Sequence, residues 1–522
     1  MTTLLQRRVI RGPRLDRGAL PVVAVQSTSA SCVLSWFMKP TCLPLLLLAL
    51  TSFAAGIAHG AAATTVSPAA DKITYEEIRV EAPFEMPVIR VPRFPRREFA
   101  ITDFGAKPGG EVKNTDAFRA AIAACHEAGG GTVVVPAGMW LTGAIHLRSH
   151  VRLHLEKNAV ISFSDDPQDY LPAVQSSWEG WECFNYSPLI YAFGCENIAI
   201  TGEGRLEPRM DTWKRWSGRP PAHMEALKRL YTWGSTGVPV DKRQMAEGEN
   251  NLRPHLIQFN RCKNALIEGI SIHHSPFWTI HLLLCDSVVV RGVNVQAHGH
   301  NNDGIDPEGT RNLLVENCRF DQGDDAIAIK SGTNHDGWRL ATPSQNIVIR
   351  NCTVINGHQL VAIGSELSGG VRNVYVHDCR FEPKDHSPFN ILYIKTNRRR
   401  GGFVENIIVE NIEASNAQFR MGVFGIETDV LYQWRRLVPA YEERLTSIRN
   451  ITVKNIRAGR TSTPFRILGD KDLAVENVTL DRISIETVRG QKNRYENARN
   501  VQETNISIGN FIEAPDKDNP NR

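Results

Sequence analysis

The chain contains 522 residues, of which 42% are hydrophobic and 22% are charged, a composition typical of a soluble protein with a substantial core. Its 60 Lys and Arg residues against 56 Asp and Glu residues leave a formal net charge of +4, which is too small to indicate a nucleic-acid-binding protein. A chain of this length often forms several domains, but the repeats described below favour one long domain.

The first feature along the chain is an apolar run from Leu43 to Ile57. It is short for a membrane span, typical of a signal-peptide core, and followed by small residues that suit signal peptidase. We therefore predict a leader and signal peptide over residues 1–62 and a secreted protein, periplasmic or extracellular, with no membrane attachment after cleavage. Met38-Lys39 would begin a compact signal, so we expect Met38 to be the true start. A twin-arginine signal at Arg7-Arg8 is the alternative.

Residues 63–96 are interpreted as an N-terminal extension, and residues 115–125 as a helix that covers the first coil of a solenoid. Thr115 is a capping residue followed by strong helix formers. The same setting indicates that the triplet Asn114-Thr115-Asp116 is a helix cap.

A short pattern returns from about residue 195 onward: a polar residue, Asn, and then an alternating apolar strand. The Asn positions are 197, 264, 312, 346, 373, 406, 450 and 477, with Ser287 in the same place once. Most spacings lie in the range of roughly 20–50 residues that marks solenoids. No helix recurs between the strands, and Asn tolerates the left-handed backbone of a tight turn, so each coil consists of strands and turns. We predict an all-β, single-domain parallel β-helix over residues 97–512 and a disordered tail over 513–522.

One spacing is much longer than the rest, and we assign its excess to a loop insertion over residues 205–253. The insertion carries Trp213, Trp216 and Trp233. Such a loop lies on one flank of a solenoid, where it either borders the binding site or only packs against the coils. If it closes one end of a cleft, the protein would act from the end of a polymer.

Ten cysteines are present, and eight remain when Cys32 and Cys42 are removed with the leader. An even number in an oxidising compartment permits disulfides. However, five cysteines recur once per repeat, which favours small buried side chains stacked inside the solenoid: Cys262, Cys285, Cys318, Cys352 and Cys379.

The residues that could carry chemistry lie in four consecutive coils. When the apolar strands are aligned, Asp303 takes the place of Asp325, and Asp324 takes the place of His358, each one coil apart. Lys395 continues the column. Stacked carboxylates repel, so at least one should hold a proton beside an ionised neighbour, which is a general acid beside a general base.

Strand parity directs Asp324 and Asp325 to opposite faces, so we predict a bend at Asp324, which Gly323 permits. Asp306 is either a further site residue or a turn partner. A ladder of aspartates at turns is the competing interpretation of the whole cluster.

The order of Asn301-Asn302-Asp303-Gly304, Gly323-Asp324-Asp325, Gly357-His358 and Ile394-Lys395 resembles glycoside hydrolase family 28, the polygalacturonases, over residues 97–512. The resemblance implies a right-handed parallel β-helix and inverting hydrolysis of α-1,4 galacturonic linkages in pectic polysaccharides or oligogalacturonides, without a metal or other cofactor. It implies that Asp324 is the general acid and that Asp303 and Asp325 activate water. His358 would maintain the ionisation states of these aspartates, and Lys395 would bind the substrate carboxylate.

Two departures from the family pattern concern specificity. Gln359 follows His358 where the family has Gly, and Tyr393 replaces Arg two residues before Lys395. We assign Tyr393 and Arg398 to substrate binding, although the run from Arg398 to Arg400 could also be a solvated charge cluster. The substrate could be rhamnogalacturonan or xylogalacturonan.

A calcium-dependent pectate lyase and a non-catalytic polysaccharide-binding β-helix are two rival functions on a similar scaffold. We expect a monomer.

Overall fold

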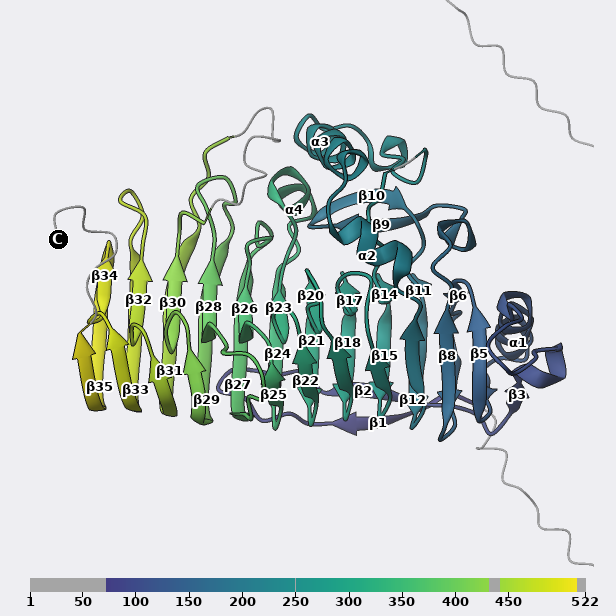
Figure 1. Ribbon diagram of the computed structural model, residues 1–522, viewed down its shortest axis with the longest axis horizontal. Helices are drawn as coiled ribbons and strands as arrows, with labels where there is room; N and C mark the ends of the chain where they lie inside the picture. The colour runs from purple at the N-terminus through teal and green to yellow at the C-terminus, as the bar shows by residue number, and fades with distance from the viewer. Residues whose placement is uncertain (1–71, 249, 431–441, 514–522) are drawn as a thin grey trace, which may run out of the picture. The chain divides into compact units, whose positions relative to one another are not determined.

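The computed structural model describes residues 72–248, 250–430 and 442–513. The predicted signal peptide, the start at Met38 and the disordered tail lie outside the described residues, except for residue 513. The described chain is a right-handed parallel β-helix, as predicted (Figure 1).

One parallel sheet carries the site and is called the site sheet below. It has eleven strands stacked in chain order, one per coil. The strands are β6 (Ile145–His146), β11 (Ile190–Phe193), β14 (Ile257–Asn260), β17 (Ile280–Leu283), β20 (Ile305–Glu308), β23 (Ile327–Ile329), β26 (Gln359–Ile363), β28 (Asn390–Lys395), β30 (Phe424–Glu427), β32 (Phe465–Leu468) and β34 (Arg494–Glu496).

The remaining walls of the coils form a continuous sheet of twenty strands. They are β3 (Glu98–Ala100), β4 (Gly131–Val135), β5 (Gly138–Thr142), β7 (Val151–Leu155), β8 (Ala159–Phe163), β12 (Glu196–Gly202), β13 (Arg205–Pro208), β15 (Lys263–Glu268), β16 (Ser271–His273), β18 (Asp286–Arg291), β19 (Asn294–Ala297), β21 (Arg311–Glu316), β22 (Arg319–Gln322), β24 (Ser344–Arg350), β25 (Thr353–Asn356), β27 (Val371–Phe381), β29 (Phe403–Phe419), β31 (Ser447–Thr461), β33 (Val475–Gly490) and β35 (Ala498–Glu513).

The repeated Asn residues form a ladder at one turn of the coil. Asn373, for example, has a φ of 54°. Its Nδ2 donates to Asn346 Oδ1 at 3.0 Å, and its Oδ1 accepts from Asn406 Nδ2 at 3.2 Å. The left-handed turn explains why Asn recurs, and the bonds between side chains hold successive coils in register.

The interior is filled by apolar side chains that repeat from coil to coil. All eight cysteines of the described chain are free and buried, and the five that recur once per repeat lie in the apolar interior of the coils, as predicted. Burial raises the pKa of the Cys125 thiol to about 12, as expected for an inert buried thiol.

Helix α1 (Thr115–Glu127) covers the first coil and buries Phe118, Ile122 and Cys125 against it. Asn114 occupies the position before the helix, but its side chain makes no capping bond. It instead accepts from Lys107 N at 2.7 Å and donates to Leu141 O at 3.2 Å. The triplet thus lies at the start of the helix, but the predicted side-chain cap is not formed, because the Asn114 side chain stabilises the preceding loop instead.

A hairpin of β1 (Thr74–Ile78) and β2 (Ile89–Arg93) runs along the outside of the coils (Figure 1). Ile89 and Val91 pack there against outward apolar residues of successive strands, including Leu266 and Val289. Residues just before the β-helix therefore brace several coils at once.

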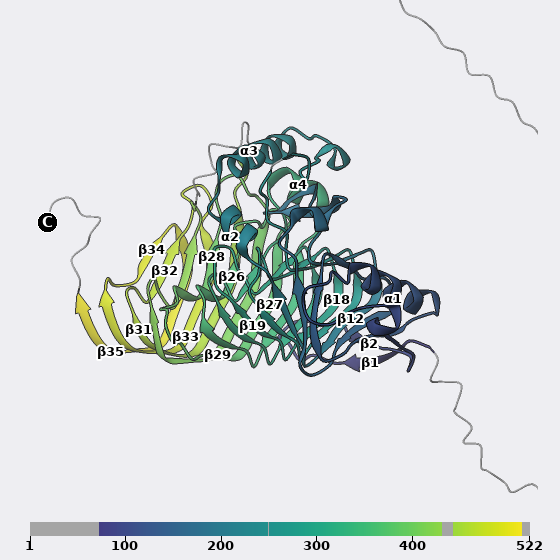
Figure 2. The same ribbon diagram turned by 45° about the vertical axis from the view of Figure 1, so that its right-hand side comes forward.

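Two excursions from the coils gather on one side of the site sheet (Figure 2). The first is a hairpin of β9 (Val174–Trp178) and β10 (Trp181–Asn185). The second follows β13, which still pairs with the sheet, and contains α2 (Asp211–Ser217), α3 (Pro221–Ser235) and the 3₁₀ helix η4 (Val240–Lys242). A 3₁₀ turn, η2 (Ile101–Phe104), and another, η3 (Pro167–Tyr170), connect earlier coils.

A buried ion pair joins these excursions to α4 (Asn334–Leu340), which follows β23. Arg243 Nη1 lies 2.6 Å from Asp336 Oδ2, and both side chains are almost fully buried. Breaking a buried pair on one side leaves an uncompensated charge, so this contact fixes the excursions relative to the coils.

Candidate active site

A cavity of about 620 Å³ lies over the site sheet. Its floor comes from β26, β28 and the residues that flank β23, and its walls come from the hairpin β9–β10, the α2–α3 excursion and the loops after β26 and β28. The polar lining includes Glu179, Arg219, His300, Asp303, Asp324, Lys330, His358, Glu366, Tyr393, Lys395, Arg399 and Arg400.

Asp324 lies at the bend that the sequence predicted. Strand β22 ends at Gln322 and β23 begins only at Ile327, so the chain turns between them. Asp324 Oδ1 lies 3.1 Å from His358 Nδ1 and accepts from the backbone N–H of Asp325 at 3.0 Å. Burial acts to raise the pKa of Asp324, but the bond and charge of His358 outweigh it and lower the pKa to about 2.

Asp325, the residue after Asp324, contacts Lys395. Lys395 Nζ lies 3.2 Å from Asp325 Oδ2, across two coils, and Asp325 is almost completely buried. Asp325 Oδ1 has no hydrogen-bond partner among the described residues. A buried acceptor without a partner in the protein is suited to bind an internal water.

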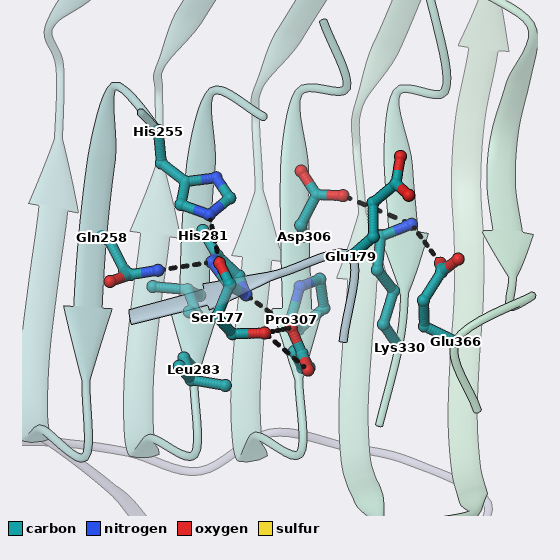
Figure 3. A network of polar contacts seen from close by, with 12 residues as sticks. Ser177, Glu179, His255, Gln258, His281, Leu283, Asp306, Pro307, Lys330 and Glu366 are labelled. Carbon is teal, nitrogen blue, oxygen red and sulfur yellow. Dashed lines mark hydrogen bonds and ion pairs between the residues drawn. The ribbon is translucent and has the colours of Figure 1, made fainter. Parts of the chain in front are cut away.

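A second group of carboxylates surrounds Lys330, a cation that sequence reasoning missed. Lys330 Nζ lies 3.3 Å from Glu366 Oε2 and 3.6 Å from Asp306 Oδ1 (Figure 3). It lies 3.9 Å from Asp303 Oδ2. Burial and the charge of neighbouring aspartates raise the pKa of Asp303 and, in spite of Lys330, that of Asp306. In the free protein this group therefore binds a proton more readily than Asp324 does.

Asp306 is neither a lining residue nor a turn partner. It is fully buried on β20 beside Lys330. Glu366, also missed, follows β26, and its pKa falls to about 2 because Lys330 and Arg400 outweigh the effect of burial. The only sequence signal for Lys330 was its place at the end of the apolar strand after Asp324 and Asp325.

The three arginines after β28, Arg398 to Arg400, point in different directions. Arg398 was predicted to bind substrate, but it does not line the cavity. Its Nη1 lies 2.7 Å from Asp470 Oδ1 and its Nη2 lies 2.7 Å from Asp472 Oδ2, and Glu443 holds its Nε. Those carboxylates of later loops draw Arg398 away, so the prediction was wrong for this residue.

Arg399 and Arg400 face the cavity in its place, together with Tyr393 and Lys395. Arg400 Nη1 donates to Asn334 Oδ1 at 2.7 Å, and its Nε donates to Ser365 O at 2.6 Å. Lys395 Nζ lies 5.9 Å from the centroid of the Tyr393 ring. The cavity thus presents several cations on the side where the sequence lacks the family arginine.

The wall that the two excursions form also escaped sequence reasoning. It contains Glu179 and Trp181 from the hairpin β9–β10, and Arg219 and Tyr231 from the α2–α3 excursion. Trp213 is buried in the main core, and neither Trp216 nor Trp233 lines the cavity. The insertion therefore borders the cavity, but through other residues than its tryptophans.

Ligand atoms of Asp324, Asp325 and His358 lie within 4.8 Å of one another, close enough to hold a cation. Protein cations already neutralise both carboxylates, since His358 contacts Asp324 and Lys395 contacts Asp325. This donor set does not fit a metal ion well, because a ligating His must be neutral while Asp324 raises the pKa of His358 against the effect of burial. The absence of a metal stays a prediction.

The sequence profile of glycosyl hydrolases family 28 matches residues 238–507, which include every member of the acidic cluster. The chain belongs to this family. It is accordingly a glycoside hydrolase.

Individual relatives agree with the family assignment. The chain is 27% identical to a probable polygalacturonase of Vitis vinifera over 398 residues, which cover 73% of this chain and 74% of that protein. It is 28% identical to an exo-poly-alpha-D-galacturonosidase of Dickeya chrysanthemi over 339 residues, 60% of this chain and 55% of that protein. The crystal structure of an exopolygalacturonase from Thermotoga maritima matches with a TM-score of 0.70 and 36% identity, covering 80% of this chain and 93% of that one.

Proposed function

We propose that this family 28 hydrolase cleaves α-1,4-galacturonosidic linkages of pectic polysaccharides and oligogalacturonides with inversion, and that it acts from a chain end. The observation that carries the proposal is the gathering of Asp303, Asp324 and Asp325 from two neighbouring coils beneath a cavity lined by cations. The names of the relatives from Dickeya chrysanthemi and Thermotoga maritima support the substrate class and the exo mode.

Asp324 is assigned the role of general acid that protonates the leaving oxygen. In the free site it is ionised beside His358, so the acid form must arise when substrate binds. A uronate that enters the cavity displaces water and brings negative charge near Lys395. Both changes raise the pKa of a neighbouring carboxyl, so binding favours the proton on Asp324.

Asp303 and Asp325 are assigned to the activation of water. Inversion requires a space of roughly 6.5–9.5 Å between the acid and base carboxyl groups, so that a water fits between them. Side chains on adjacent coils, about 4.8 Å apart along the solenoid, can span that separation. The Oδ1 atoms of Asp303 and Asp325 are buried acceptors with no hydrogen-bond partner among the described residues, which suits them to hold such a water.

Lys395, Tyr393, Arg399 and Arg400 are assigned to the substrate carboxylates. A lysine ammonium acts as a mobile point charge, while arginine presents a planar fork that matches a carboxylate. The positive charges of Lys395, Arg399 and Arg400 on the cavity wall compensate for the loss of the family arginine, which Tyr393 replaces. The wall that contains Glu179 and Arg219 favours binding of a chain end over binding of the middle of a chain along an open cleft.

Secretion through a signal peptide within residues 1–62 remains part of the proposal. Within the described residues, none of the helices combines the length and the apolar character needed to cross a membrane. Pectic polymers occur outside cells, which agrees with an enzyme released to the periplasm or the medium.

The test is hydrolysis of polygalacturonate by Asp324→Asn. We expect the rate of reducing-end release to fall by about 100-fold or more, because general acid catalysis contributes roughly that factor. Asp116→Asn is the control, because it makes the same change at an aspartate that is exposed on α1 and lies in a triplet like that of Asp303. Equal turnover of wild type and Asp324→Asn would refute the catalytic assignment.

The same assay separates the rival substrates and reactions. Parallel incubations with rhamnogalacturonan and xylogalacturonan show whether Tyr393 marks a branched or modified substrate. A lyase would produce unsaturated, ultraviolet-absorbing ends from polygalacturonate, and their appearance in place of saturated reducing ends would contradict hydrolysis.

A further inference from the structure

The hairpin β9–β10 ends in a two-residue turn, Glu179-Gly180, whose first residue is unusual. The φ angles are 45° at Glu179 and 80° at Gly180, so both residues are left-handed, as in a type I′ turn. Asn-Gly is the favoured sequence for this turn, and a long side chain such as Glu is disfavoured at its first position. A residue that keeps an unfavourable backbone in a site wall indicates that its side chain serves a function.

The turn is held tightly where it meets the coils. Thr333 N donates to Gly180 O at 3.0 Å, and Thr333 Oγ1 donates to Glu179 O at 2.9 Å. A Cβ on Gly180 would lie only 2.4 Å from Thr333 Oγ1. The backbone at the tip therefore has little room to move.

The strand before the turn is fixed by buried polar contacts (Figure 3). Ser177 Oγ lies 3.3 Å from Glu308 Oε2, which lies 2.9 Å from His281 Nε2 on the site sheet. Ser177 O also lies 2.9 Å from His255 Nε2. These contacts place Glu179 above the same sheet as Lys330 and Asp306.

One oxygen of the Glu179 carboxyl group accepts a hydrogen bond from the described part of the chain, and the other does not. Its Oε2 accepts from the Tyr231 hydroxyl of α3 at 2.5 Å. No residue in the described ranges donates a hydrogen bond to its Oε1, and this oxygen is not completely buried. One carboxyl oxygen is thus available in the cavity that also contains Asp303 and Asp324.

The chemistry of an α-1,4 chain gives this oxygen a specific task. In every internal residue O4 belongs to a glycosidic bond and carries no hydrogen. Only the residue at the non-reducing end has a free 4-hydroxyl group that can donate. A carboxyl oxygen at a fixed wall therefore distinguishes an end from the middle of a chain by one hydrogen bond.

We propose that Glu179 is a specificity-determining residue that accepts a hydrogen bond from the 4-hydroxyl group of the terminal, non-reducing galacturonic acid. The hairpin blocks further sugars beyond that residue, and Tyr231 holds the carboxyl group in place. The inference rests on the proposed galacturonan hydrolysis and adds the residue that selects the chain end.

The test compares two trigalacturonates, one normal and one in which hydrogen replaces the 4-hydroxyl group at the non-reducing end. We expect wild type to prefer the normal substrate in kcat/KM by at least about 100-fold, because sites built for a substrate hydroxyl reject analogues that lack it. Glu179→Asn should reduce that preference to within about threefold. Asn suits the turn, so this variant should melt at the same temperature as wild type or higher.

Two further variants separate recognition from packing. Tyr231→Phe should weaken the preference partly, because it removes the hydroxyl group that orients Glu179. Glu203→Gln, at an exposed position outside the cavity, should leave the preference unchanged.

An unchanged preference in folded Glu179→Asn would overturn the assignment of Glu179. Equal hydrolysis of both trigalacturonates by wild type would also overturn it. So would release of the label from a substrate labelled at its reducing end, because the enzyme would then act from that end. In each case the proposed hydrolase activity would stand. If wild type hydrolysed no galacturonan at all, the proposed function would fail together with this inference.

Discussion

Lys330 is the buried cation around which the acidic side chains of the site gather. Three carboxylates lie within 3.9 Å of its Nζ, and the Trp278 ring centroid lies 4.5 Å away. A buried charge is costly unless it is paired, so Lys330 and its carboxylates stabilise one another. We infer that Lys330 sets how easily Asp303 loses its proton.

Lys330→Gln should therefore shift the pH dependence of kcat/KM. Burial already raises the pKa of Asp303, and Lys330 acts to lower it, so loss of the ammonium raises that pKa further. The ionised base then forms only at higher pH. We expect the acidic limb of the profile to move up by about one unit or more, the usual effect of a neighbouring charge.

The control for this profile is Lys384→Gln, which removes an exposed lysine outside the cavity. An acidic limb at the same pH in wild type and Lys330→Gln would show that Lys330 only fills space. A change in KM alone would assign Lys330 to substrate binding instead.

At the scale of the element, the Asn ladder is the clearest case in which sequence determines structure. Each Asn combines a positive φ with a bond to the next coil, so no other residue serves both purposes equally well. Asn373→Ala loses both features, whereas Asn373→Gly keeps the backbone freedom and loses only the side-chain bonds.

We expect Asn373→Ala to lower the free energy of unfolding by about 2 kcal/mol, the sum of left-handed strain and a lost hydrogen bond. Asn373→Gly should cost about half as much. Denaturant titration of the three proteins checks the order, and equal stability of Ala and Gly variants would show that the positive φ contributes nothing.

The elements also show why part of the site could be predicted and part could not. Asp303, Asp324 and His358 follow the coil repeat, so alignment of the apolar strands was enough to bring them together. Glu179 and Arg219 lie on excursions that interrupt the repeat, and their place depends on tertiary contacts such as the Arg243–Asp336 pair.

Arg398 failed for a related reason. It follows the end of β28, where strand alternation no longer fixes the direction of side chains, and carboxylates of later loops determine its position. The motif identified the correct segment, but only the folded loop distinguishes Arg398 from Arg399 and Arg400.

At the scale of the whole β-helix, the stacked coils supply a rigid floor and the excursions supply the selective walls. The acidic cluster comes from strands β20, β23 and β26 and their ends, Lys395 comes from β28, and these strands lie side by side in one sheet. A site on regular strands is held more precisely than one on loops alone. Walls built from excursions can vary between family members while the catalytic floor stays the same.

The most direct test of the central claim is proton NMR of the first product released from polygalacturonate. The account predicts that wild type releases saturated galacturonic acid whose anomeric carbon is initially β, because the α linkage is inverted by water held between acid and base. Asp324→Asn should release almost none of it. A product that is initially α, or one with an unsaturated end, would contradict the account.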